Sequence, residues 1–139
     1  TRLALPMMKE RNFGRIINIA SVHGLVASVQ KAAYVAAKHG IIGLTKVVAL
    51  ECAQQNITAN SVCPGWVLTP LVEAQVEAIA AKDAINYEQA VEKLRAEKQP
   101  SLRFVALEEL AALCLFLASS SAASITGASM PIDGGWTAR

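Results

Sequence analysis

The sequence predicts an α/β fold built on a doubly wound parallel sheet. Short runs rich in β-branched residues alternate along the chain with longer helical patterns, which is the order that parallel crossover units produce. Of the 139 residues, 53% are hydrophobic and only 17% are charged, as expected for a sheet covered by helices on both faces. This length suits one domain with a core of its own.

Three runs are expected to form the strands of this sheet. Each is short and apolar and ends in small or turn-forming residues, as buried strands do. They are "RIINIAS" (15–21), "ITANSVCPG" (57–65) and "SMPIDGG" (129–135). Three strands alone would leave the first with an exposed edge. We therefore expect residues 1–139 to be the carboxyl-terminal part of a single domain, in which preceding residues supply further strands.

Helical patterns fill the intervals between these strands. They lie at roughly residues 31–54, 70–82, 87–98 and 108–118. The opening stretch "TRLALPMMKE" reads as the end of another helix. The span 68–104 interrupts the regular alternation, because it is charged and contains Asn86 and Pro100 between and after short helices. We expect it to be an insertion that lies over one end of the sheet.

Composition argues against several classes of partner. The formal charge of +2, without a basic run, gives no sign of nucleic-acid binding. The longest uninterrupted apolar run, residues 110–118, is about half the length of a membrane span, which predicts a core or interface helix. Cys52, Cys63 and Cys114 are odd in number and widely spaced, so we expect reduced thiols, no metal site and a cytoplasmic location.

The stretch "YVAAKHG" places Tyr34 and Lys38 four positions apart at the start of the first long helix. Residues with this spacing share one helix face. A free tyrosine ionises only near about pH 10, and a nearby ammonium favours its phenolate form. The pair is therefore a candidate general acid/base, able to protonate an alkoxide or to accept the proton of an alcohol.

Ser21 is expected close to this pair, because ligands of open α/β sheets bind beyond the carboxyl ends of the strands. It ends the first predicted strand, thirteen positions before Tyr34, and its hydroxyl could hydrogen-bond the same substrate oxygen. A hydrolase is disfavoured, because Ser21 is not in a Gly-x-Ser-x-Gly turn and His23 has no evident aspartate partner. The three side chains suit proton transfer coupled to hydride transfer.

The order strand-Ser, Tyr-x-x-x-Lys and strand-Pro-Gly resembles the short-chain dehydrogenase/reductase family. The resemblance runs from "FGRIINIAS" through "AAYVAAKHGIIGLTKVVALE" and "ITANSVCPGWVLTP" to "ITGASMPIDGG". It implies a Rossmann-like fold, Tyr34 as the catalytic acid/base, Ser21 as the group that polarises the substrate oxygen, and Lys38 as a ligand of the nicotinamide ribose.

The resemblance also implies a nicotinamide cofactor, which we expect to be NAD. The residues expected to bind it, besides Tyr34 and Lys38, follow the second strand: Pro64, Gly65, Trp66, Val67 and Thr69. The family's glycine-rich phosphate turn and its catalytic asparagine would precede Thr1, as would the residue that selects NAD or NADP. We expect the 139-residue chain alone to be inactive.

Three polar residues near the pair suggest the substrate. His23, Lys31 and Gln75, if directed inward, would make a cationic pocket rich in hydrogen-bond donors that suits a small carboxylate. Patterns such as "SVHGLVAS" and "CPGWVLTPLVEAQ" resemble family members that interconvert (R)-3-hydroxybutyrate and acetoacetate. This implies that residues 68–104 form a substrate lid with Trp66 at its hinge, and that Trp136 closes the pocket or packs in the core.

Two alternatives remain open at this stage. The chain could belong to a reductase of the same family that acts on a 3-ketoacyl or polyol substrate. It could also be a non-catalytic part that contributes only subunit contacts, because the helices at 31–54 and 108–118 are apolar. The resemblance implies a homotetramer for the longer protein.

Overall fold

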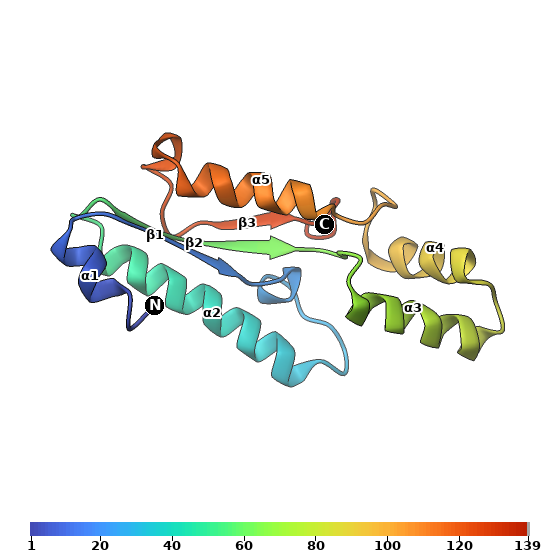
Figure 1. Ribbon diagram of the computed structural model, residues 1–139. Coiled ribbons are helices and arrows are strands. Elements are labelled where there is room, and N and C mark those ends of the chain that lie inside the picture. Colours follow the sequence, from blue (N-terminus) through green and yellow to red (C-terminus); the bar gives the residue numbers. More distant parts are fainter. Residues whose placement is uncertain (139) are drawn as a thin grey trace.

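Three parallel strands form the sheet in the computed structural model, which describes residues 1–138. They are β1 (Gly14–Ile19), β2 (Ile57–Pro64) and β3 (Ser129–Ile132), and β2 is central (Figure 1). Ile16 pairs with Ala59, and Ser61 with Ser129. The predicted strands are confirmed, although each ends slightly earlier than its sequence pattern, and β1 is left at an edge of the sheet.

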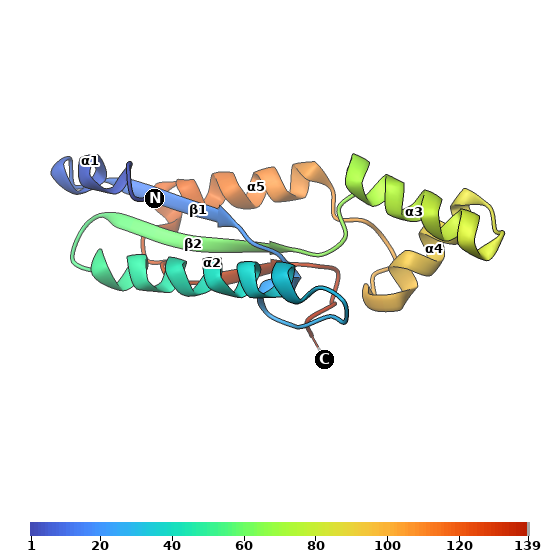
Figure 2. The same cartoon turned by 90° about the horizontal axis from the view of Figure 1, so that it is seen from below.

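Seven helical segments accompany the strands within residues 1–138. They are α1 (Leu5–Glu10), η1 (Val22–Gly24), α2 (Ala32–Glu51), α3 (Pro70–Asp83), α4 (Tyr87–Lys98), α5 (Leu107–Ala118) and η2 (Ser120–Ala122). The helix α2 connects β1 to β2, whereas α5 lies on the path from β2 to β3. Figure 2 shows the sheet between α2 on one side and α5 on the other, which is the predicted doubly wound arrangement.

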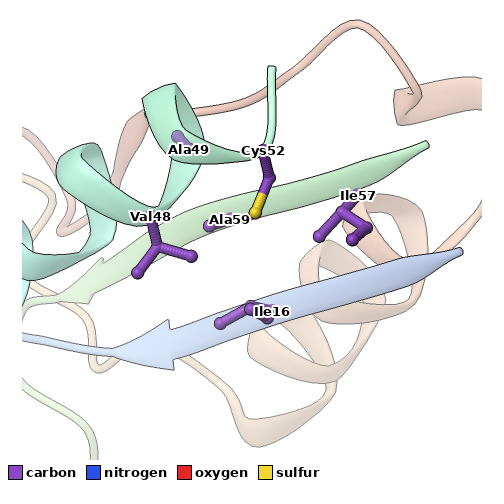
Figure 3. Packing of buried hydrophobic residues seen from close by; sticks show 6 residues of the cluster. All are labelled: Ile16, Val48, Ala49, Cys52, Ile57 and Ala59. Atoms are coloured by element: carbon purple, nitrogen blue, oxygen red, sulfur yellow. The ribbon is translucent and has the colours of Figure 1, made fainter. Parts of the chain in front are cut away.

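The two faces of the sheet have separate apolar cores, because successive strand residues point to opposite sides. Ile16 and Ala59 pack with Val48, Ala49 and Cys52 under α2, in the cluster drawn in Figure 3. On the other face, Val62 packs with Leu117 of α5, and Ile17 lies against them. Neighbouring residues 16 and 17 of one strand thus contribute to opposite layers.

The helices α3 and α4 form a hairpin beyond the carboxyl ends of the strands (Figure 1). Val72 and Val76 of α3 pack against Ala90 and Leu94 of α4. Asn86 caps α4, since its side chain accepts a hydrogen bond from the backbone of Gln89 while the Gln89 side chain accepts one from the Asn86 backbone. The hairpin occupies most of the predicted insertion.

The base of this insertion is closed by contacts between its two ends. Gln99 is fully buried, and its Oε1 accepts a hydrogen bond from Trp66 N at 2.8 Å. Its Nε2 donates to the carbonyl of Arg103. Val105 N donates to Trp66 O at 2.8 Å, so both backbone groups of Trp66 are held. Trp66, which the resemblance implies as the hinge of a lid, thus has both of its backbone groups hydrogen-bonded to the far end of the insertion.

Replacing Gln99 by Leu should lower the free energy of unfolding by roughly 2–4 kcal/mol, because the backbone N–H of Trp66 and the carbonyl of Arg103 lose their partner. Denaturant unfolding measures the change. The whole protein is used here and below, which means this chain together with any residues that precede it. Gln54→Leu is the matched control, since Gln54 is exposed and should change stability little. Equal stabilities of the two variants would contradict the structural role of Gln99.

The helix α2 is long and apolar enough to cross a membrane by length and composition alone, with a mean hydropathy of 1.3. The longest uninterrupted apolar run of the sequence, residues 110–118, lies instead in the shorter helix α5. The buried residues of α2 are Ile42, Thr45, Val48 and Ala49, and several of them contact the strands. This packing is that of a helix covering a sheet. All three cysteines are free thiols, as expected.

Candidate active site

A cavity of about 380 Å³ lies where the carboxyl ends of β1 and β2 meet the starts of α2 and α3. The sequence-predicted residues that line it are Ser21, His23, Lys31, Tyr34, Gly65, Trp66, Val67, Thr69 and Gln75. Val22, Leu71, Val72 and Trp136 complete the lining. Lys38 and Pro64 lie outside it. No carboxylate of the described residues faces this cavity, so its polar groups are cations, amides and hydroxyls.

Tyr34 and Lys38 lie together on the first turns of α2. The ammonium nitrogen of Lys38 is 5.6 Å from the centre of the Tyr34 ring and donates to Ile19 O at 3.1 Å. The contact with Ile19, at the end of β1, directs the long side chain back toward the strand. Tyr34 is 47% exposed, so its hydroxyl can be reached from the cavity that the ring helps to line. The two side chains converge, as the sequence spacing predicts.

Ser21 lies two residues beyond β1, where it caps the short helix η1. Its Oγ accepts a hydrogen bond from His23 N at 3.2 Å. Within residues 1–138, no protein acceptor takes the hydroxyl hydrogen. The hydroxyl is therefore oriented by the cap and retains a donor for a ligand in the cavity.

His23 is almost completely buried, and its ring lies between two aromatic rings. The ring centres are 5.9 Å from Tyr34 and 5.4 Å from Trp136, in edge-to-face geometry. Burial and the charges of Lys31 and Lys98 lower the pKa of His23, although the backbone of Val26 opposes the shift. The neutral imidazole keeps one donor and one acceptor. Its Nδ1 is buried without a hydrogen-bond partner in the described part of the chain.

Lys31 and Gln75 approach the same cavity from different helices. Lys31 precedes α2, and its Nζ lies 5.4 Å from the centre of the Trp66 ring. Burial, followed by the charge of Lys98, lowers the pKa of Lys31, while Glu97 acts in the opposite direction. Gln75 belongs to α3, where its Nε2 makes only a long contact of 3.4 Å to Leu71 O. Both head groups can thus turn toward an anion.

The segment after β2 lies close to its neighbours, as a cofactor-binding turn requires. A Cβ added to Gly65 would lie 2.7 Å from Gln99 Oε1 and 2.9 Å from the Cα of Asp133, so only glycine fits. Val67 and Thr69 line the cavity, whereas Pro64 is buried at the end of β2. The indole Nε1 of Trp66 is buried without a partner among the described residues. These features fit the nicotinamide end of a dinucleotide.

Two further residues, Trp136 and Lys98, lie at or near the cavity. Trp136 follows β3, lines the cavity, and packs against Trp66 with ring centres 5.5 Å apart. The rule that ligands bind beyond strand ends could have assigned it to the pocket. Lys98 ends α4, and its Nζ is 5.7 Å from the Trp136 ring. No local pattern distinguishes this lysine from others on the same helix.

Several known proteins are similar in sequence to this chain. A family model described as enoyl-(acyl carrier protein) reductase matches residues 1–137. The chain is 63% identical over its full length to a D-beta-hydroxybutyrate dehydrogenase of Cupriavidus necator, of which it covers 54%. It is 55% identical over 99% of its length to a D-beta-hydroxybutyrate dehydrogenase of Rhizobium meliloti, again covering 54%. The chain therefore belongs to the short-chain dehydrogenase/reductase family.

The fold has solved counterparts in the same family. The crystal structure of a variant of actinorhodin polyketide ketoreductase with NADPH superposes with a TM-score of 0.85 at 39% identity. The match covers 93% of this chain and 49% of that one. The predicted Rossmann-like fold is thereby confirmed. The chain spans about half the length of the curated relatives it matches.

Proposed function

We propose that the whole protein interconverts (R)-3-hydroxybutyrate and acetoacetate with NAD as the redox cofactor. The observation that supports this best is that His23, Lys31 and Gln75 line one cavity with Ser21 and Tyr34. A carboxylate beside His23, Lys31 and Gln75 would gain a cation and hydrogen-bond donors. The oxygen on the β-carbon of the substrate would then face the hydroxyls of Ser21 and Tyr34. The similarity to two D-beta-hydroxybutyrate dehydrogenases points to the same substrate.

In this proposal Ser21 and Tyr34 act on the same substrate oxygen. The Ser21 hydroxyl, held by its bond from His23 N, donates to the oxygen and stabilises the negative charge that develops there during reduction. Tyr34 gives its proton to that oxygen, and takes it back when the alcohol is oxidised. The positive charge of Lys38 near the ring favours the phenolate that the second direction needs.

The residues that would hold NAD surround the open side of Tyr34. Lys38 would bind the nicotinamide ribose, and Gly65, Trp66, Val67 and Thr69, with Pro64 beneath them, would line the nicotinamide ring. When bound, NAD supplies the hydride acceptor, or NADH the donor. Trp66 and Trp136 cover one wall of the cavity and exclude water from the reacting atoms. We propose that residues 68–104 act as a lid over this site.

The proposal is tested by mixing the whole protein with NAD or NADP and a panel of alcohols, while following the absorbance of the reduced cofactor. Fastest turnover with NAD and (R)-3-hydroxybutyrate is expected. Faster turnover of a 3-ketoacyl thioester in the reverse direction, or of a polyol, would assign the protein to the alternative substrate class. A reaction that requires NADP would overturn the choice of NAD.

Replacing Lys31 by Ala should raise the KM for acetoacetate about 10- to 100-fold with little change in kcat, because the carboxylate loses a partly buried cation. Steady-state kinetics at saturating NADH measure both constants. Lys46→Ala, on the exposed side of α2, is the control. An unchanged KM in the Lys31 variant would remove this residue from the carboxylate site.

The subunit arrangement and location are also proposals. We propose a cytoplasmic homotetramer, in which exposed apolar residues of α2 make contacts between subunits. Leu44, Val47 and Leu50 are 46%, 51% and 78% exposed in the single chain. Light scattering on the whole protein measures the number of subunits, and a monomer would contradict this assembly.

A further inference from the structure

Lys98 lies next to the proposed carboxylate site but does not line the cavity. We propose that Lys98 is a positioning residue, which fastens the end of the α3–α4 hairpin to the loop before Lys31 and adds positive potential to the site. In this way it makes the pocket selective for anionic over neutral substrates. The inference rests on the function proposed above and assigns a further determinant of specificity to the same site.

Lys98 lies outside the cavity and contacts two parts of the structure beside it, the loop that contains Ser28 and the ring of Trp136. Its Nζ donates to Ser28 Oγ at 2.9 Å, in the loop between His23 and Lys31. The same ammonium lies 5.7 Å from the ring centre of Trp136, and Trp136 in turn packs edge-to-face against His23. A single head group on the hairpin therefore contacts both the loop that carries the substrate residues and the aromatic wall.

Two cations act on the groups of this region. Among the described residues, the titratable groups near it are His23, Lys31 and Tyr34 from the η1–α2 segment, and Glu97 beside Lys98 on α4; the charges of Lys31 and Lys98 both act on His23, and that of Lys98 acts on Lys31. Glu97 Oε1 is 3.4 Å from Lys98 Nζ, but the Glu97 side chain is 60% exposed, so water weakens the attraction between the two charges. Lys31 and Lys98 thus repel one another across the pocket wall, and a bound anion would relieve that repulsion.

A purely structural reading of Lys98 is that it favours the carboxyl end of α4, where a cation offsets the helix dipole. Lys93 of the same helix provides the comparison. Its Nζ pairs with Asp83 at 2.7 Å across the hairpin, and its side chain is 61% exposed. Lys93 therefore stabilises the α3–α4 hairpin without contacting the cavity. Lys98, in contrast, contacts Trp136, which lines the cavity, and Ser28, which lies in the loop before Lys31.

The test compares the reduction of acetoacetate with that of its neutral methyl ester by the whole protein and by Lys98→Met, Lys98→Arg and Lys93→Met. In Lys98→Met the KM for acetoacetate should rise about tenfold, whereas kcat and the KM for the ester should stay unchanged. Lys98→Arg should restore most of the preference for the anion. Lys93→Met should resemble the unmodified protein.

Three outcomes would overturn the inference: an unchanged KM for acetoacetate in Lys98→Met, equal losses for acid and ester, or no restoration by arginine. A second measurement does not depend on turnover. Titration with acetate, followed by the fluorescence of Trp66 and Trp136, should give weaker binding for Lys98→Met than for Lys93→Met. If the unmodified protein fails to reduce acetoacetate, the proposed function is wrong, and this titration alone decides the role of Lys98.

Discussion

Replacing Tyr34 by Phe in the whole protein should reduce the rate of acetoacetate reduction by about 10³- to 10⁴-fold while NAD still binds. The change removes one hydroxyl and keeps the ring. The ring's contact with His23, at 5.9 Å between centres, and its place beside the Lys38 ammonium should therefore persist. Steady-state rates and calorimetric titration with NAD measure the two properties separately.

The matched control for this change is Tyr87→Phe. The chain contains two tyrosines, and Tyr87 is 40% exposed at the start of α4, so it is similar in exposure to Tyr34 but does not line the cavity. Its loss of a hydroxyl should leave the rate unchanged. Undiminished turnover in the Tyr34 variant would remove the tyrosine from the chemistry. Loss of NAD binding together with turnover would instead assign it a binding role.

The fold and the position of the candidate site could largely be predicted from the sequence, because both follow from short-range patterns and one rule of topology. The β-branched runs define parallel strands, and the carboxyl ends of such strands meet at one edge. Ser21 after β1 and Gly65 after β2 were therefore expected near each other, and both line the cavity. The i to i+4 spacing gave the convergence of Tyr34 and Lys38.

The contacts that complete the site could not be predicted in this way. Gln99 holds the backbone of Trp66 from 33 positions away, and Lys98 reaches Ser28 from 70 positions away. Such pairs depend on how the α3–α4 hairpin packs, and periodicity within either helix does not determine this. The two bound backbone groups of Trp66 could not be predicted for the same reason, since nothing in the sequence near that residue indicates their partners.

The small residues around Tyr34 have a physical explanation in the structure. Ala33, Ala36 and Ala37 are exposed on the first turns of α2, and the buried residues of this helix begin only at Ile42. The start of α2 lies against η1, where Gly24 closely approaches the backbone of Lys38, but it contributes no fully buried side chain to the core. Alanine is the strongest helix former, so it maintains the helix there while leaving the space around the phenol open.

Replacing Ser21 by Ala in the whole protein should lower kcat for acetoacetate reduction about 10²- to 10³-fold, because one donor to the developing oxyanion is lost. Ser21 also caps η1, and the loss of such a cap costs about 1 kcal/mol of stability. A modest fall in Tm is therefore expected as well. The two effects are separable, since destabilisation lowers the amount of folded enzyme but not the rate of each folded molecule.

The expected kinetic pattern is a lower kcat with a nearly unchanged KM, because Ser21 is proposed to contact the reacting oxygen and not the carboxylate. Active-site titration with NADH gives the concentration of folded enzyme, to which kcat is referred. Ser124→Ala, at an exposed position between η2 and β3, is the control and should keep full activity. A normal kcat per folded site in the Ser21 variant would mean that Ser21 only caps η1, and that Tyr34 alone acts on the substrate oxygen.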